Sequence, residues 1–349
     1  MNLAMISVCR SLWQDRVAGL ALLVALVAIN PARADLPTLM VSYPGPRNIS
    51  YLPIDLIPAI GADKAEGAQV KFLHAGGGGV ALSNLMKRNA DFAVAGLPAA
   101  MSMRANGGDV VCLAPVDDAP LFIFMVRSKL KGQVKRVADL RGRVVGVNTG
   151  SLASKTTSQQ LAELVLRSDN VPLDKVHFVP AGQSWEAQSA LIDSGMADAI
   201  MGDEPFASRL LAQGKVFFLT NLADPAAAKN IRGAGFLHAA LVTRADLLQQ
   251  EPKKAEQMVR ILKRSLAWMA SHSPEEIVAK LDIQDPEERA ALVGSLKKYS
   301  RLYSRDGRFS SAQLKETETF FQQTSEGNPV AQGFVLESMI VDRWAGRVK

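Results

Sequence analysis

Cysteine and histidine are scarce in this chain of 349 residues, which contains two cysteines and four histidines. Cys9 lies in a segment that we expect to be removed, so Cys112 is left without a partner for an internal disulfide. The apolar run around Cys112 predicts a buried thiol. No spacing typical of a metal site links cysteines or acids to the histidines, His74, His177, His238 and His272. We therefore expect no disulfide framework, no metal site and no cofactor.

Clustered charge and catalytic motifs are also missing. The formal net charge is +6, but Lys and Arg are scattered, and aromatic residues make up only 6% of the chain. A basic stripe typical of nucleic-acid binding is therefore absent, and we expect no nucleic-acid partner. The sequence has no Walker A motif, and Ser151 and Ser154 stand in neither a nucleophile-elbow nor a Ser-x-x-Lys pattern. We do not expect an enzyme.

The apolar run over residues 17–29 is too short to span a bilayer. It follows Arg10 and Arg16 and precedes Ala32-Arg33-Ala34. A basic start, a short apolar centre and a small-x-small site are the parts of a secretory signal peptide. We predict a signal peptide over residues 1–34, cleavage after Ala34 and a periplasmic location. The alternative is an uncleaved membrane anchor.

What the sequence does contain is an alternation of strand and helix patterns. Apolar strand signals alternate with amphipathic helical runs from residue 38 to 126, and the pattern restarts at residue 144. This alternation predicts parallel sheets with helices on both faces. From about Pro252 the chain is almost all helical, and Pro252, Pro274 and Pro286 mark expected helix starts. The length suffices for two lobes with separate cores.

Two stretches of the chain repeat one pattern. Residues 70–83 and 176–189 both follow V-x-F-[L/V]-x-A-G-x-x-x-x-A-x-S. Downstream, residues 90–98 and 197–205 both run from Ala-Asp through an apolar strand to Pro at equal spacing. We interpret the repeat as two lobes with one topology. The alternative is coincidence between similar strand–helix–strand units.

Each repeat contains a turn between a strand and a helix. The first turn holds Gly76, Gly77, Gly78 and Gly79, and the second holds Gly182, Gln183, Ser184 and Trp185. Ligands of open α/β sheets bind beyond the carboxyl ends of the strands, where helix N-termini offer free N–H groups. The four glycines therefore predict either a close approach to a ligand or backbone with positive φ.

The first glycine turn also has a superficial likeness to a dinucleotide-binding fingerprint, since Gly76-x-Gly78-x-x-Ala81 follows a strand and opens a helix. In that fingerprint an acidic residue that binds ribose follows at the carboxyl end of the next strand. Here Asp91 lies at the start of that strand, at the opposite edge of the sheet. We do not expect a nucleotide site.

Three longer motifs carry a family resemblance. They are "LMKRNADFAVAG" (85–96), "VADLRGRVVGVNTGS" (137–151) and "ALIDSGMADAIMGDEPFASRL" (190–210). With them the chain resembles the solute-binding proteins of ABC importers for nitrate, sulfonates and taurine, whose relatives bind pyrimidine precursors of thiamine. The related pyrimidine-synthesising enzymes depend on a cysteine-rich motif, which this chain lacks.

The resemblance implies a two-lobed, type II periplasmic binding protein fold of the α/β class. Each lobe would be a mostly parallel sheet flanked by helices, and a helical tail would end the chain. The implied first lobe comprises residues 35–124 and 238–349, and the second comprises residues 125–237. The chain would cross between the lobes near residues 124–126 and 236–241.

The candidate ligand-binding residues of the first lobe follow its strands. Tyr43 could stack on a ligand or cap the core. Arg47 could pair with an anion or lie in solvent. The four turn glycines follow the second strand, and Leu97 follows the third.

The second lobe offers six candidates. Thr149, Gly150 and Ser151 could bind sulfonate or carboxylate oxygens or cap a helix. Gln183 lies in the second turn, and Trp185 could form an apolar wall or anchor its helix. Glu204 could bind an amine or a pyrimidine, or cap the next helix. The family position favours Glu204 over Asp203 for the cleft.

These features together predict a periplasmic binding protein that closes two lobes around a small polar, anionic ligand of the sulfonate, taurine or nitrate type. Its partners would be that ligand and an inner-membrane ABC permease, and we expect a monomer. The alternatives are the ligand-binding module of a sensor receptor, and a protein or enzyme of this fold for pyrimidine precursors of thiamine.

Overall fold

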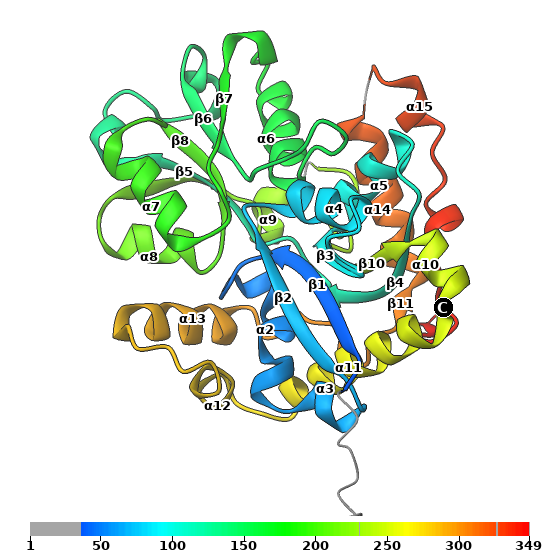
Figure 1. Ribbon diagram of the computed structural model, residues 1–349. Helices are drawn as coiled ribbons and strands as arrows, with labels where there is room; N and C mark the ends of the chain where they lie inside the picture. The colour runs from blue at the N-terminus through cyan, green and yellow to red at the C-terminus, as the bar shows by residue number, and fades with distance from the viewer. Residues whose placement is uncertain (1–35, 230, 326, 349) are drawn as a thin grey trace, which may run out of the picture. The chain divides into compact units, whose positions relative to one another are not determined.

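The structure is a computed structural model that describes residues 36–229, 231–325 and 327–348 (Figure 1). The predicted signal peptide lies outside these residues and stays a prediction. From Thr38 onward the chain forms one compact unit that contains both large sheets. Among the described helices, none combines the length and the apolar character needed to cross a membrane.

The first large sheet joins five strands, and its core begins with three parallel ones. β1 pairs with β2 on one side and with β3 on the other, both in parallel. β10 then pairs antiparallel with both β3 and β4. The strand order is β2 (Gln69–Ala75), β1 (Thr38–Pro44), β3 (Phe92–Gly96), β10 (Ala239–Arg244) and β4 (Val110–Asp117).

The second large sheet repeats this arrangement. β6 is parallel to β7 and β8, and β5 is antiparallel to β8 and β9. The strand order is β7 (His177–Pro180), β6 (Val144–Val147), β8 (Ala199–Asp203), β5 (Phe122–Arg127) and β9 (Val216–Asn221). In each sheet the antiparallel strand comes from a chain segment that has just left the other sheet. The two-lobed fold with one shared topology is therefore confirmed.

We call the parts of the chain built around these sheets the first and the second lobe. The expected boundary after residue 124 falls inside β5, all of which pairs in the second sheet. The first crossing therefore lies at residues 118–121, between β4 and β5, and the second lies between β9 and β10. The sequence pattern missed this because β5 is as apolar as a strand of either sheet.

Helices flank both sheets (Figure 1). Those of residues 49–250 are η1 (Ile49–Tyr51), α2 (Leu52–Ala59), α3 (Ala62–Ala65), α4 (Gly78–Met86), α5 (Leu97–Ala105), η2 (Ser128–Leu130), η3 (Val137–Leu140), α6 (Thr157–Ser168), η4 (Leu173–Lys175), α7 (Trp185–Ser194), α8 (Phe206–Ala212), α9 (Pro225–Ala228) and α10 (Ala245–Gln250). α2 ends at Ala59, shortly before Gly61, which adopts a left-handed conformation with φ of 69°.

The C-terminal segment is largely helical, as predicted. Its elements are α11 (Pro252–Ala270), α12 (Pro274–Ala279), α13 (Pro286–Lys298), β11 (Phe309–Ser310), α14 (Ser311–Thr324), α15 (Pro329–Gln332), η5 (Leu336–Met339) and β12 (Arg347–Val348). α11, α12 and α13 each have proline near their first position, which confirms the three predicted starts.

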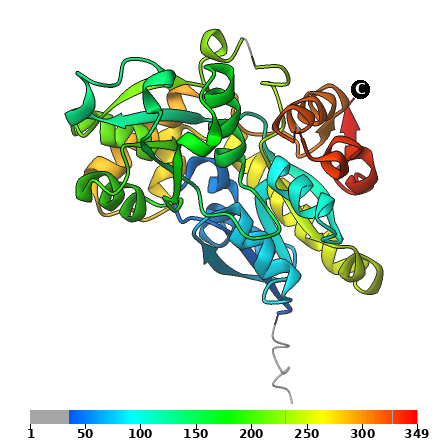
Figure 2. The same ribbon diagram turned by 90° about the horizontal axis from the view of Figure 1, so that it is seen from above.

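The C-terminal helices contact both lobes. α11 packs against α2 and β4, while α13 contacts η1 of the first lobe and α8 of the second. α14 lies between α5 and α6. The view in Figure 2 shows the last part of the chain, orange to red, beside the cyan helix α5. Each lobe keeps its own core, and Cys112 in β4 is fully buried, as predicted.

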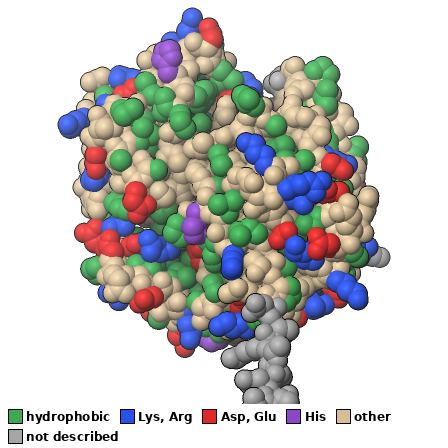
Figure 3. All heavy atoms as spheres, in the orientation of Figure 1, with side chains coloured by type: hydrophobic (Ala, Val, Ile, Leu, Met, Phe, Trp, Pro, Cys, Tyr) green, Lys and Arg blue, Asp and Glu red, His purple; other side chains and the backbone are tan. Residues whose placement is uncertain are grey.

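Charged side chains are mixed on the molecular surface. On the face shown in Figure 3, Lys and Arg lie among Asp and Glu, and no large region carries one sign. On this face, the scattered charge of the sequence stays scattered.

Candidate functional site

The loops after the parallel strands of the two sheets meet each other. The loop after β1 contacts the end of β8, where the Ile49 amide donates to the Glu204 carbonyl over 3.4 Å. The loop after β6 contacts the turn after β2, where the Thr149 amide donates to the Gly76 carbonyl over 3.4 Å. The carboxyl ends of the two sheets therefore face each other, which is where ligands of such sheets bind.

Asp203, the last residue of β8, lies at the centre of this border and is 1% exposed. Its carboxylate accepts hydrogen bonds from Asn48 Nδ2 at 2.6 Å and from Gln183 Nε2 at 2.5 Å. Gln188 Nε2 donates to its other oxygen over 3.3 Å. Burial raises the pKa of Asp203, while these three amides act in the opposite direction. Asn48 comes from the first lobe, so this carboxylate joins both lobes.

A second buried acid, Asp117 at the end of β4, lies near this centre. Its Oδ2 is 3.0 Å from His238 Nδ1, and its Oδ1 accepts from the Ala239 amide over 2.5 Å. The other ring nitrogen of His238 faces Gly96, because a Cβ built on Gly96 would stand 3.6 Å from Nε2. The same Cβ would overlap with Thr157 Oγ1, so a larger residue here would displace the Thr157 side chain.

Tyr51 is buried close enough to both acids for their charges to act on it. Its ring centroid lies 6.4 Å from that of His238. Burial, followed by the charges of Asp203 and Asp117, raises the pKa of Tyr51 well above its usual value. We call the following set the interlobe cluster: Asn48, Tyr51, Asp117, Thr157, Gln183, Gln188, Asp203 and His238.

Several buried polar atoms at these strand ends have no hydrogen-bond partner among the described residues. They are Ser50 Oγ, Asn148 Oδ1, Thr157 Oγ1 and Gln188 Oε1. Leaving a buried polar group unpaired costs about 1–3 kcal/mol. Two of these atoms, Thr157 Oγ1 and Gln188 Oε1, belong to the cluster, so a molecule bound there would find two buried groups to pair with.

The turn glycines allow a close approach, but the group that approaches them is the backbone of another chain segment rather than a ligand. A Cβ on Gly77 would lie 2.7 Å from the Thr149 amide nitrogen, and one on Gly79 would lie 2.7 Å from Gly150 Cα. None of the four glycines adopts the left-handed conformation, and Gly77 has an extended φ of 171°, so the explanation by left-handed backbone was wrong. We call the contact of Gly76, Gly77 and Gly79 with Thr149, Gly150 and Ser151 the glycine seam.

Thr149, Gly150 and Ser151 do not cap a helix. α6 begins only at Thr157, and the Thr156 hydroxyl accepts from the Gln159 amide as its cap. Ser151 instead exchanges backbone hydrogen bonds with Ser154 in a tight turn. Ser154 is held away from the helix by this turn.

Tyr43, Arg47 and Leu97 lie outside the interlobe cluster. Tyr43 is fully buried, donates its hydroxyl proton to Asp55 and packs edge-on against Phe72. Arg47 pairs with Glu288 of α13, with Nε 2.5 Å from Oε1. Leu97 is buried in the core of the first lobe. For Tyr43 the structure favours the core position that the sequence left open.

Of the candidates Gln183, Trp185 and Glu204 in the second lobe, only Gln183 joins the interlobe cluster. Gln183 reaches Asp203, whereas the Trp185 ring packs beneath Arg209, whose guanidinium carbon is 3.9 Å from the ring centroid. The Glu204 carboxylate accepts from the Ser208 amide at 3.0 Å and hydroxyl at 2.8 Å, and so caps α8. Asp203, rather than Glu204, faces the cluster, since neighbouring residues at a strand end point to opposite sides.

The sequence patterns did not single out Asn48, Tyr51, Asp117, Thr157 or His238 as site residues. One signal was available for two of them, since Asp117 and His238 flank the two crossings between the sheets. Both crossings enter the border between the lobes, so polar residues there have reason to face a ligand. Their pairing spans 121 positions of the chain, which no local pattern encodes.

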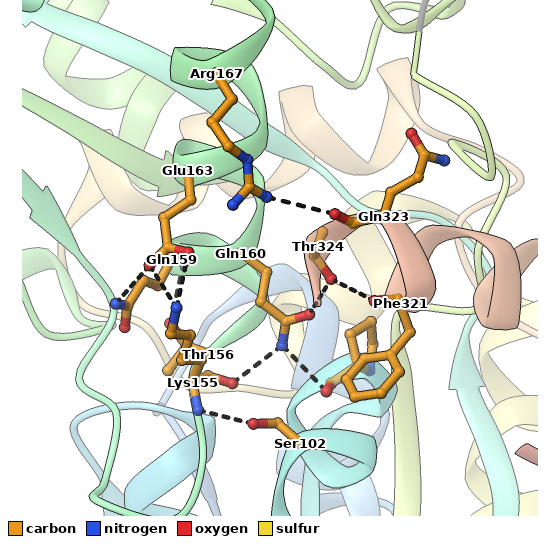
Figure 4. A network of polar contacts seen from close by, with 11 residues as sticks. Ser102, Lys155, Thr156, Gln159, Gln160, Glu163, Arg167, Phe321, Gln323 and Thr324 are labelled. Carbon is orange, nitrogen blue, oxygen red and sulfur yellow. Dashed lines mark hydrogen bonds and ion pairs between the residues drawn. The ribbon is translucent and has the colours of Figure 1, made fainter. Parts of the chain in front are cut away.

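A polar cavity of about 460 Å³ lies elsewhere, between α5, α6 and α14. Figure 4 shows its network, in which Gln160 donates to the Lys155 carbonyl and accepts from Thr324, while Lys155 pairs with Glu163 at 2.8 Å. These groups satisfy one another, so the network links α6 to α14. Across the described residues, no three His, Cys, Asp or Glu side chains are grouped to hold a metal ion.

Two sheets of one topology, with a polar cluster between their carboxyl ends, define the periplasmic binding protein fold. Similar solved structures include a protein from Bordetella bronchiseptica RB50, with a TM-score of 0.79 and 20% identity, covering 88% of this chain and 95% of that one. A family model described as "NMT1/THI5 like" matches residues 64–277, more than half of the chain. The chain therefore belongs to the NMT1/THI5-like family, and the resemblance stated from its motifs is confirmed.

Two further structures with this fold carry functional names. The alkanesulfonate-binding protein SsuA from Xanthomonas axonopodis pv. citri, bound to MOPS, has a TM-score of 0.70 and 15% identity over 90% of this chain and all of that one. The nitrate-binding protein NrtA from Synechocystis PCC 6803 has a TM-score of 0.66 and 12% identity over 87% of this chain and 86% of that one. At these identities the likeness establishes the fold. No curated protein matches the chain.

Proposed function

We propose that this protein is the solute-binding component of an ABC importer and binds a small polar molecule at the interlobe cluster. The observation that carries the proposal is the Asp203 carboxylate, which takes hydrogen bonds from Asn48 of one lobe and Gln183 of the other. The binding proteins for alkanesulfonate and nitrate with this fold support the same general role. The periplasm and a permease partner follow from that role.

The chemistry of the cluster favours a ligand with N–H or O–H donors over an anion. Within the cluster, Asp203 and Asp117 are carboxylates, and the unpartnered Gln188 Oε1 is an acceptor. The cluster contains no Lys or Arg to balance a sulfonate or nitrate. An amine or an amino-substituted heterocycle would place its donors on these oxygens, and this agrees with the pyrimidine alternative of the sequence analysis.

Binding in this position requires the lobes to move. The cluster is almost completely buried, so a ligand enters when the lobes separate and is enclosed when they return. Enclosure removes water and strengthens each remaining polar contact. The ligand favours the closed form only through contacts with both lobes, which Asn48 and Gln183 are placed to supply.

A thermal-shift screen tests this proposal. The panel contains taurine, MOPS, nitrate, simple carboxylates, aliphatic amines and aminopyrimidines. A true ligand at a hundredfold excess over its dissociation constant adds about 2.7 kcal/mol of stability. We expect stabilisation by a donor-bearing compound. Stabilisation by nitrate or sulfonates alone would contradict the proposed ligand chemistry. If no compound binds, or if every compound that binds still binds Asp203→Ala, the proposed site is wrong.

A further inference from the structure

An ion pair between α8 and α13 lies at the edge of the border between the lobes, outside the interlobe cluster. Arg209 of α8 belongs to the second lobe, and its side chain is only 9% exposed. Its Nη2 pairs with the carboxylate of Asp285, the N-cap of α13, and lies 3.8 Å from Glu287 Oε2. α13 packs against η1 of the first lobe, so the pair spans both lobes.

A residue of the second lobe fixes the Arg209 side chain in position for this contact. Its guanidinium carbon lies 3.9 Å from the centroid of the Trp185 ring, in cation–π geometry. A stacked, planar guanidinium loses little further freedom when it binds a carboxylate. Trp185 therefore supports Arg209, in place of the ligand wall that the sequence predicted as one alternative.

The same end of α13 makes two more contacts. Gln213, the C-cap of α8, donates to Glu287 over 2.9 Å. Glu288 pairs with Arg47, which precedes Asn48 in the loop after β1. The start of α13 thus contacts the second lobe directly, and it also holds the loop that delivers Asn48 to Asp203. A substitution at the start of α13 can therefore change the position of Asn48, although no residue of this helix end contacts the ligand.

We propose that Arg209, supported by Trp185, and Asp285 form an interlobe latch that stabilises the closed form of the protein. They are positioning residues, because they set the balance between open and closed lobes rather than contact the ligand. The relevance of the latch to affinity rests on the proposed function. A contact present only in the closed form shifts the equilibrium toward that form, and a partly buried ion pair is screened by salt less than a surface pair.

Asp285 offers a clean substitution. Its Oδ1 accepts from the Glu287 and Glu288 amides and so caps α13, while its Oδ2 faces Arg209. Asp285→Asn keeps the capping oxygen and removes the charge. Arg209→Gln removes the charge on the other side. Glu275→Gln is the matched control, because Glu275 pairs with Lys297 between α12 and α13, away from the second lobe.

The experiment measures the distance between the lobes by pulsed EPR without any ligand. Spin labels are attached at Met196→Cys in the second lobe and Val335→Cys in the C-terminal segment, which are 69% and 54% exposed. Cys112 stays unlabelled, because it is fully buried and burial raises the pKa of its thiol. Circular dichroism and melting curves verify that each variant folds.

We expect Asp285→Asn and Arg209→Gln each to shift the distance distribution away from the closed form. The double variant should shift it no further than either single one, because one interaction is removed in all three. Glu275→Gln should leave it unchanged. Raising NaCl from about 0.01 M to about 1 M shortens the screening length from roughly 30 Å to 3 Å, and should open the parent protein more than Asp285→Asn.

Three results would overturn the latch: a fully open parent protein at low salt, unchanged distributions in both single variants, or additive shifts in the double variant. None of these depends on the ligand screen. The latch can therefore fail while a ligand is found, and the proposed function can fail while the latch is confirmed.

Discussion

The turns after β2 and β7 occupy equivalent places in the two lobes but have different roles. In the first turn, glycines let the backbone approach Thr149 and Gly150 of the opposite lobe. In the second turn, side chains act: Gln183 reaches Asp203, and Trp185 supports Arg209. Shared topology thus delivers both turns to one border, and residue identity decides whether a turn supplies backbone contact or binding groups.

The comparison extends to the acids of the two lobes. Asp55 of the first lobe holds Tyr43 and the Arg47 amide, so its role is structural. Asp203 of the second lobe collects amides from both lobes. If this division is correct, substitution of Asp203 affects ligand binding as well as stability, whereas substitution of Asp55 affects stability alone.

The largest expected effect is that of Asp203→Ala. Three amides would lose their acceptor, at about 1–3 kcal/mol for each group left unpaired. We expect a marked fall in the free energy of unfolding and loss of ligand binding, measured by chemical denaturation and calorimetry. Glu204→Gln is the control, since it keeps an oxygen for Ser208. Equal loss of binding in both variants would contradict the placement of Asp203 in the site.

Asp55→Asn tests the structural side through pH. Burial raises the pKa of Asp55 to about 6, while the hydrogen bonds from Tyr43 and Arg47 act in the opposite direction. The folded protein therefore holds a proton that the unfolded chain releases near pH 4, and stability falls as pH rises through about 4 to 6. A shift of about two units corresponds to about 3 kcal/mol.

We expect Asp55→Asn to remove this part of the pH dependence, measured by urea denaturation between pH 4 and pH 7. Asparagine retains an oxygen for the Tyr43 hydroxyl. Ligand affinity should stay unchanged, because Asp55 lies outside the interlobe cluster. A large loss of affinity would break the division between the lobes.

Gly77→Val tests the glycine seam. The φ of Gly77 is 171°, an extended value that valine adopts, so the fold of the first lobe should persist. Its side chain would collide with the backbone of Thr149 and hold the lobes apart. We expect affinity to fall at least tenfold, about 1.4 kcal/mol, with little change in the melting temperature of the ligand-free protein.

Gly78→Val provides the contrast to Gly77→Val. A Cβ there meets Ala95 of the same lobe at 3.3 Å, so this variant should lower the melting temperature rather than only the affinity. Small-angle scattering would show a larger radius of gyration for Gly77→Val with ligand than for the parent protein. If Gly77→Val and Gly78→Val change affinity, melting temperature and radius of gyration in the same way, the glycine seam does not control closure of the lobes.

The smallest expected effect is that of Trp185→Leu. Loss of the cation–π contact with Arg209 costs about 0.5–2 kcal/mol. If Trp185 supports the latch, Trp185→Leu should weaken affinity severalfold, and the loss should vanish in an Asp285→Asn background. An undiminished loss in that background would mean that Trp185 acts on the ligand directly.

Much of the site was not predicted from the sequence, and the reasons can be identified. Gln183 was chosen because a turn after a parallel strand points toward a ligand, and the structure does bring it to Asp203. Glu204 and Asp203 were interchanged because a sequence does not show which of two neighbours at a strand end turns inward. His238 and Asp117 were missed because their contact joins two crossings that are far apart along the chain.

Local chemistry determined the elements of this protein. Strand signals with a repeated motif predicted two lobes of one topology, and the prolines at 252, 274 and 286 predicted three helix starts, because periodicity and capping depend on near neighbours. Only the tertiary structure decided what meets the glycines, which acid lies between the lobes and where Trp185 packs. Those outcomes depend on how segments that are not neighbours in the sequence approach each other, and such distances are set by the packing of the whole chain.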